Sequence, residues 1–128
     1  MFKIAAFLFA IAALGGLALA VLHFRARGKT QPPTSLAMLH GLLAVLAVIC
    51  LIFGIAATPN GFSAGFASMA LTALVLFVLA ALGGAYMFLG KHLRGEPLPT
   101  PVVVIHGMVA VAGFVLLLVY LFGTPVTA

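Results

Sequence analysis

The phrases LHGLLAV, at residues 39–45, and IHGMVAV, at residues 105–111, place two of the chain's four histidines in the same short context. In each phrase a histidine is followed by glycine and then by an apolar run. A second pair of phrases, LFAIAALGG at residues 8–16 and LFVLAALGG at residues 76–84, occurs in the same order. Two glycine pairs and two His-Gly pairs in register predict an internal duplication, with one repeat over residues 1–57 and the other over residues 67–123.

The composition indicates the environment in which these repeats fold. Of the 128 residues, 66% are hydrophobic and 5% are charged, which is too apolar for a soluble domain of this size. Apolar stretches cover residues 2–24, 36–57, 67–89 and 102–122, and each has about the 20 residues that cross a ~30 Å hydrocarbon core as a helix. Because the first stretch recurs in the second half, we expect a retained helix there rather than a cleaved leader.

These stretches predict one transmembrane domain over residues 1–128. Its fold class is all-α: an integral membrane, up-down-up-down four-helix bundle built from two repeated helical hairpins. Short connections make successive helices antiparallel neighbours, and the repeats would enter the membrane from the same side. Ser35 and Thr100 are the expected N-caps of the second and fourth helices, with Pro101 in the first helical position of the fourth. A Pro-Asn-Gly turn at residues 59–61 would join the hairpins.

The basic residues predict the orientation. Five of the six Lys and Arg residues lie in two loops on one side of the bundle: Arg25, Arg27, Lys29, Lys91 and Arg94. The positive-inside rule then makes loops 25–34 and 90–100 cytoplasmic and leaves both termini outside, in an expected bacterial inner membrane. The net charge of +5 reflects this topology and attraction to anionic lipid, not nucleic-acid binding.

His40 and His106 start the second and fourth helices from the same side, so we expect them at matching depth and facing each other. An ionisable residue inside a membrane span indicates a function. Small residues near the two histidines are expected to leave a slot for a flat group and to contact it: Gly15, Gly16, Gly83, Gly84, Gly41, Gly107, Ala44 and Ala110.

A single haem b would fit such a slot, with His40 and His106 as its two axial metal ligands. It would be non-covalent, because c-type attachment needs two cysteines and the chain has one. We expect Arg25, Arg27 and Arg94 to pair with the propionates. We also expect the second nitrogen of each histidine to bond a backbone carbonyl of its preceding turn.

With His40, His106 and their flanking glycines, the chain resembles the small four-helix membrane b-type cytochromes. The resemblance implies a bis-histidine haem electron carrier, or a haem-bearing subunit, that exchanges electrons with a quinone pool or a partner redox protein. Two protein ligands leave no open position on the iron, which favours electron transfer over substrate catalysis by this chain alone.

Several alternatives stay open. The histidine pair could be structural, or it could bind copper together with Met38 and Met108. The chain could be a cofactor-free scaffold subunit or a transporter, a homo-oligomer or a subunit of a larger complex in the lipid bilayer. His23 and His92 are expected at the membrane interface near lipid headgroups, with a propionate contact or proton transfer near a quinone as the alternatives.

Overall fold

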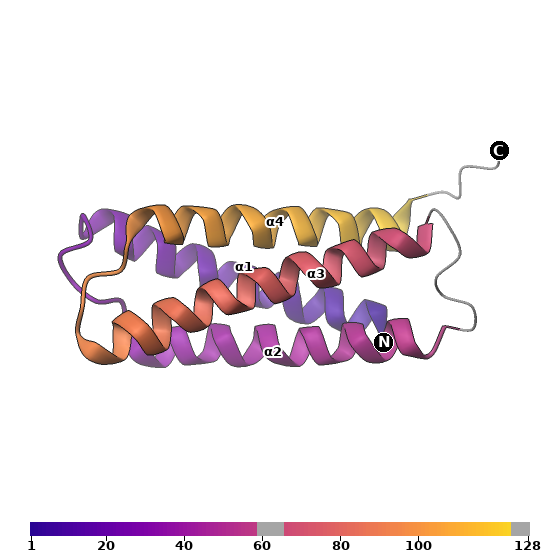
Figure 1. Ribbon diagram of the computed structural model, residues 1–128, viewed down its shortest axis with the longest axis horizontal. Helices are drawn as coiled ribbons and strands as arrows, with labels where there is room; N and C mark the ends of the chain where they lie inside the picture. Colours follow the sequence, from indigo (N-terminus) through magenta and orange to yellow (C-terminus); the bar gives the residue numbers. More distant parts are fainter. Residues whose placement is uncertain (59–65, 124–128) are drawn as a thin grey trace.

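The computed structural model describes residues 1–58 and 66–123, and within these ranges it is helical, without strands. The long helices are α1 (Phe2–Arg25), α2 (Thr34–Ala56), α3 (Phe66–Ala85) and α4 (Thr100–Phe122). A π-helical segment η1 (Tyr86–Lys91) and a 3₁₀ turn η2 (His92–Arg94) extend α3. Successive helices run in opposite directions along the long axis (Figure 1). The prediction of an all-α chain with four long apolar helices is confirmed; the turn predicted at residues 59–61 lies outside the described residues.

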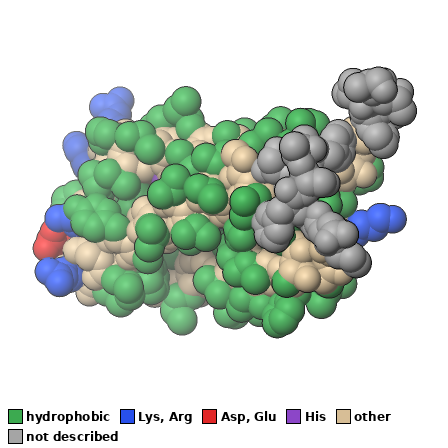
Figure 2. All heavy atoms as spheres, turned by 45° about the vertical axis from the view of Figure 1, so that its right-hand side comes forward, with side chains coloured by type: hydrophobic (Ala, Val, Ile, Leu, Met, Phe, Trp, Pro, Cys, Tyr) green, Lys and Arg blue, Asp and Glu red, His purple; other side chains and the backbone are tan. Residues whose placement is uncertain are grey.

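The surface of the bundle is apolar along its length. Four helices are long and apolar enough to cross a membrane: Phe2–Arg25, Thr34–Ala56, Met69–Arg94 and Thr100–Phe122. Large apolar side chains point outward from them, with Phe7 66%, Leu14 69% and Met108 67% exposed. Lys and Arg side chains gather at one end of the molecule, beside the acidic Glu96 (Figure 2). Exposed apolar area of this extent is stable in lipid rather than in water, as in an integral membrane protein.

The core is built from contacts between residues that occupy matching positions in the two halves. Helices α1 and α2 pack closely as one hairpin and α3 and α4 as the other, and the two hairpins meet along a looser interface. Phe9 and Phe77 stack across this interface with ring centroids 3.6 Å apart and planes 9° from parallel. Leu51 and Leu117, on α2 and α4, are fully buried. Both pairs occupy equivalent positions in the two predicted repeats, so each hairpin contributes the same residues to the centre of the bundle.

The loops at the basic end are tied together. The side-chain amide of Gln31 donates to the backbone carbonyl of Glu96, which links the α1–α2 connection to the connection before α4. The Lys91 ammonium donates to the Glu96 carboxylate over 2.6 Å. This hydrogen bond, followed by the charge of Lys91, holds the pKa of the Glu96 carboxyl below its ordinary value. Because both side chains are partly exposed to solvent, the pair contributes little to stability.

The predicted N-caps at Ser35 and Thr100 are wrong. Helix α2 begins two residues earlier and helix α4 one residue earlier than the caps require, at Thr34 and Thr100. Pro33 and Pro99 precede them, and neither start has a side-chain cap. The two threonine hydroxyls instead bond histidines on the opposite hairpin. At Thr100 this long-range contact takes the hydroxyl that the predicted cap would use.

The π-helical segment η1 compensates for one extra residue between the glycine pair and the following histidine in the second half. His23 lies seven residues after Gly16, whereas His92 lies eight residues after Gly84. In an α-helix one extra residue turns every later side chain by about 100°. The i→i+5 hydrogen bonds of a π-helix take up one residue per turn. His92 thereby returns to the side of the helix that His23 occupies on α1, and each histidine bonds a helix-starting threonine.

Deleting Leu89, an exposed residue within η1, should therefore be tolerated. The deletion gives the second half the spacing of the first, so the segment should become α-helical while His92 keeps its threonine partner. We expect the Tm of the detergent-solubilised protein to change by less than about 4 °C, a shift on the order of 1 kcal/mol.

Deleting Leu17 is the matched control, because it is equally exposed but lies in the regular helix α1. This deletion should rotate His23 away from Thr100 and leave a buried polar group without its partner, which costs roughly 1–3 kcal/mol or about 5–10 °C in Tm. Equal losses from the two deletions would contradict the role assigned to η1.

Candidate functional site

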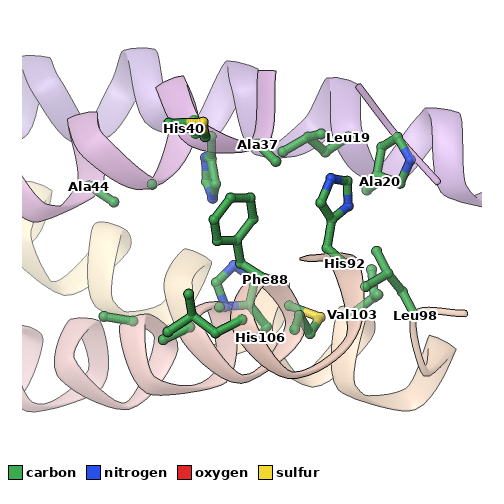
Figure 3. A pocket seen from close by; sticks show the side chains of 18 of the residues that line it. Leu19, Ala20, Ala37, His40, Ala44, Phe88, His92, Leu98, Val103 and His106 are labelled. Carbon is green, nitrogen blue, oxygen red and sulfur yellow. The ribbon is translucent and has the colours of Figure 1, made fainter. Parts of the chain in front are cut away.

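His40 on α2 and His106 on α4 face each other across the interface between the hairpins. Their ring centroids lie 6.1 Å apart and their planes are inclined by 79°. Each histidine lies six residues after the first residue of its helix, which gives both the same depth from the basic end. Both rings project into one cavity (Figure 3), as the sequence predicts.

A backbone carbonyl on the neighbouring helix holds each ring in place. His40 Nδ1 donates to the Ala12 carbonyl on α1, and His106 Nδ1 donates to the Ala80 carbonyl on α3, both over 2.8 Å. The predicted acceptor, in the preceding turn of the same helix, is wrong, because a side chain that points into the bundle reaches the adjacent helix first. A carbonyl can only accept, so Nδ1 carries the hydrogen. In a neutral imidazole this leaves the lone pair of Nε2 unprotonated.

Gly16 and Gly84 allow this contact. In an α-helix the carbonyl of Ala12 also accepts from the backbone N–H of Gly16, so a side chain at position 16 would lie beside the acceptor. A Cβ at Gly16 would lie 2.9 Å from His40 Cε1, and a Cβ at Gly84 would lie 3.2 Å from His106 Cε1. These two glycines therefore leave room for the imidazoles, and their first contact is with histidine rather than with a bound group.

The other predicted small residues are less constrained. A Cβ at Gly15 or Gly83 would meet the histidines at 3.6–4.0 Å, an ordinary contact, and a Cβ at Gly41 or Gly107 would meet nothing within 4 Å. Of the small residues predicted at the site, Gly41, Ala44 and Gly84 line the cavity. The following do not: Gly15, Gly16, Gly83, Gly107 and Ala110.

The cavity has a volume of about 500 Å³, within the range of small-molecule sites. Its walls come mainly from α2 and the α3–η1 helix. Leu19, Ala20 and His23 of α1 and Val103 and His106 of α4 complete them. Phe88, from η1, projects into it (Figure 3). All four histidines of the chain line it. The site is thus an apolar space with imidazoles at two levels.

The second level consists of His23 and His92. They are 2% and 8% exposed, so the prediction that they face lipid headgroups is wrong. His23 Nε2 shares a hydrogen bond with Thr100 Oγ1 over 3.0 Å, and His92 Nε2 shares one with Thr34 Oγ1 over 2.9 Å. Each bond crosses from one hairpin to the other. The sequence carried a signal for this arrangement in the matched Pro-Thr pairs at residues 33–34 and 99–100.

The arginines predicted to contact a bound group lie elsewhere. Arg25, Arg27 and Arg94 are exposed at the end of the bundle and do not line the cavity. The polar side chains nearest the basic loops in the cavity wall are His23 and His92. Burial of these imidazoles between the hairpins leaves the longer arginine side chains outside, where they can extend into headgroups or solvent.

The donor set limits which metal centres could fit. Over residues 1–58 and 66–123, no group of three or more His, Cys, Asp or Glu side chains is placed to hold a metal ion. Met38 lines the cavity, but Met108 does not and is 67% exposed, so the copper set suggested by the sequence is not assembled. The site offers two imidazole nitrogens as metal ligands. It therefore suits a metal cofactor that brings its other ligands with it.

No protein-family model matches the chain, and the comparisons with curated proteins and with solved structures gave no match either.

The tight contact at Gly16 predicts that Gly16→Ala destabilises the protein. The new methyl group would press on a ring that its carbonyl bond prevents from moving, and overpacking of this kind costs about 1–3 kcal/mol. Gly41→Ala is the control, because its added Cβ meets nothing and alanine favours the helix by up to ~1 kcal/mol. Thermal unfolding in detergent should show a lower Tm for the first variant and an unchanged or higher Tm for the second. The reverse order would refute the proposed role of Gly16.

Proposed function

We propose that this protein is a membrane b-type cytochrome in which His40 and His106 are the axial ligands of one non-covalent haem b. The observation that carries the proposal is the pair of facing imidazoles, each fixed by an Nδ1–H bond to a carbonyl. Histidines that bind metals through Nε2 commonly donate Nδ1–H to such an acceptor, because the bond sets the tautomer and orients the ring. Both unprotonated nitrogens are thus available for one centre between the hairpins.

The separation of the rings supports a shared metal. A metal–imidazole bond of about 2.0–2.1 Å, with ~1.1 Å from the nitrogen to the ring centroid, would put the two centroids ~6.3 Å apart when collinear. The observed value is 6.1 Å. A porphyrin would supply the remaining metal ligands itself, so the chain would need to provide only His40 and His106. The two hairpins pack less closely against each other than their own helices do, so a flat porphyrin could lie between them.

The haem, when bound, would supply one-electron chemistry. The chain's own residues would hold it: His40 and His106 as ligands, and apolar side chains such as Ala44 and Phe88 as its surroundings. Because His40 and His106 would both be ligands, the haem would suit electron transfer rather than binding of a reactant at the iron. Its electron partner would be a membrane quinone or another redox protein.

A cofactor-free scaffold subunit or a transporter is the second candidate. It is favoured by the hydrogen bond that each of the four histidines makes within the chain. It leaves the unprotonated Nε2 atoms of His40 and His106 without a role. An absorbance spectrum of the protein from a haem-replete host distinguishes the two candidates.

His40→Ala and His106→Ala should each abolish the low-spin haem spectrum or convert it to high spin. Each variant removes one proposed haem ligand, and the losses should be similar because the two histidines have equivalent hydrogen-bond partners. The measurement is the reduced-minus-oxidised spectrum of the purified protein. Met108→Leu is the control, since Met108 lies near His106 in sequence but points outward, and its spectrum should match the wild type. A wild-type protein without a Soret band would overturn the proposal.

We also propose that loops 25–34 and 90–100 lie on the cytoplasmic side of a bacterial inner membrane, with both termini outside. The distribution of Lys and Arg supports this orientation, because five of the six lie at that end. Reporter fusions at Ala128 and at Gly95 test it. An alkaline phosphatase fused at Ala128 should be active and one fused at Gly95 inactive; the opposite pattern would invert the topology.

A further inference from the structure

The cavity differs between its two ends. At the deep end, beyond the His40–His106 pair, its wall is formed by Ala44, Val45 and Ala81. At the end nearest the basic loops, His23 and His92 line it, beside Pro32 and Leu98. A ligand that fills the space from one end to the other would be apolar over most of its length and polar at one edge.

His23 and His92 each have an unused hydrogen-bonding atom. Both rings are more than nine-tenths buried, and both bond a threonine hydroxyl through Nε2. Across the part of the chain that the structure describes, their Nδ1 atoms make no hydrogen bond. A buried imidazole with one free nitrogen can bond a further polar group, and when protonated it forms a charge-assisted bond to a carboxylate.

The charges around these two histidines favour an anion. Helices α2 and α4 begin at Thr34 and Thr100, the partners of the two rings, so the positive ends of two helix dipoles lie at this level. Five Lys and Arg residues lie at the same end and add a positive potential. Glu96, the only acidic residue of the chain, is already paired with Lys91.

We infer that His23 and His92 bind the carboxylates of the ligand held between His40 and His106. The inference rests on the proposed function and extends it, because it defines the ligand class as a planar apolar molecule with acidic groups along one edge, which is the chemistry of a dicarboxylic porphyrin. Six residues, ~9 Å along α2, separate His40 from Thr34, the partner of His92. This rise is comparable with the distance from the iron of haem to its carboxylates. His23 and His92 therefore replace Arg25, Arg27 and Arg94 as the partners of those groups.

The test compares two porphyrins that differ only at the acidic edge. Haem-free protein in detergent is titrated with haem and with haem dimethyl ester, and binding is followed by the Soret shift. The wild type should bind haem about tenfold or more tightly than the ester. The double variant His23→Phe/His92→Phe, which keeps two aromatic rings, should bind both porphyrins with equal affinity. It should still give the low-spin spectrum, because the axial ligands remain.

Two control variants separate carboxylate binding from a structural role. Thr34→Val/Thr100→Val removes the hydroxyl partners but keeps both histidines, so the preference for haem over its ester should persist. Arg25→Gln/Arg94→Gln removes the charges that the sequence suggested as partners, and the preference should persist there too. A purely structural role for the histidines would make the threonine variant behave like the histidine variant.

Each remaining outcome is decisive. Equal affinity of the wild type for haem and its ester, with a low-spin spectrum, would overturn this inference and leave the proposed function standing. The inference would also be overturned if the histidine variant still bound haem more tightly than the ester, or if the arginine variant lost this preference. No low-spin spectrum with either porphyrin would instead refute the proposed function. If the double histidine variant does not fold, the single variants and the wild-type comparison still decide.

Discussion

The carbonyl oxygens of Ala12 and Ala80 each accept a hydrogen bond from a histidine of the next helix, in addition to the bond made within their own helix. Much of the structure depends on this shared acceptor. It requires glycine four residues later, where a Cβ would lie 2.9–3.2 Å from the ring, and it requires close packing of the two helices in each hairpin. It also fixes the tautomer of His40 and His106, so that Nε2 of each neutral ring keeps a free lone pair.

The apolar surroundings make every polar contact inside the bundle consequential. In hydrocarbon an unpaired polar group has no water to bond, and its burial costs several kcal/mol. The four histidines meet this requirement in two ways: His40 and His106 use backbone carbonyls within a hairpin, while His23 and His92 use threonine hydroxyls across the hairpins. The first kind of bond orients a ring within one hairpin. The second joins the two hairpins at the basic end of their interface, which is looser than the packing within each hairpin.

The sequence predicted the helices and the facing of His40 and His106 because both follow from patterns that act locally or repeat: 20-residue apolar runs, and a phrase that recurs at the same distance from a helix start. It did not predict that Ala12 and Ala80 would be the acceptors, since any residue of a helix offers a carbonyl. It placed His23 and His92 at the headgroups because the one-residue difference between the halves concealed their equivalence. A π-helical segment has no reliable sequence signature, so the compensation by η1 could be found only in the structure. The sequence also did not predict that the arginines lie outside the cavity, because the direction in which a loop side chain extends cannot be read from the loop sequence.

The segment η1 has a consequence beyond restoring the position of His92. It carries Phe88 into the cavity, whereas the position that corresponds by the glycine register in the first half is Ala20, which lines the same cavity. Each wall carries one of the paired imidazoles, but the two walls differ one step closer to the loops. A flat molecule with unlike substituents on its two sides would therefore meet a bulky aromatic ring on one side and a methyl group on the other, so its two flipped orientations would be unequal in free energy.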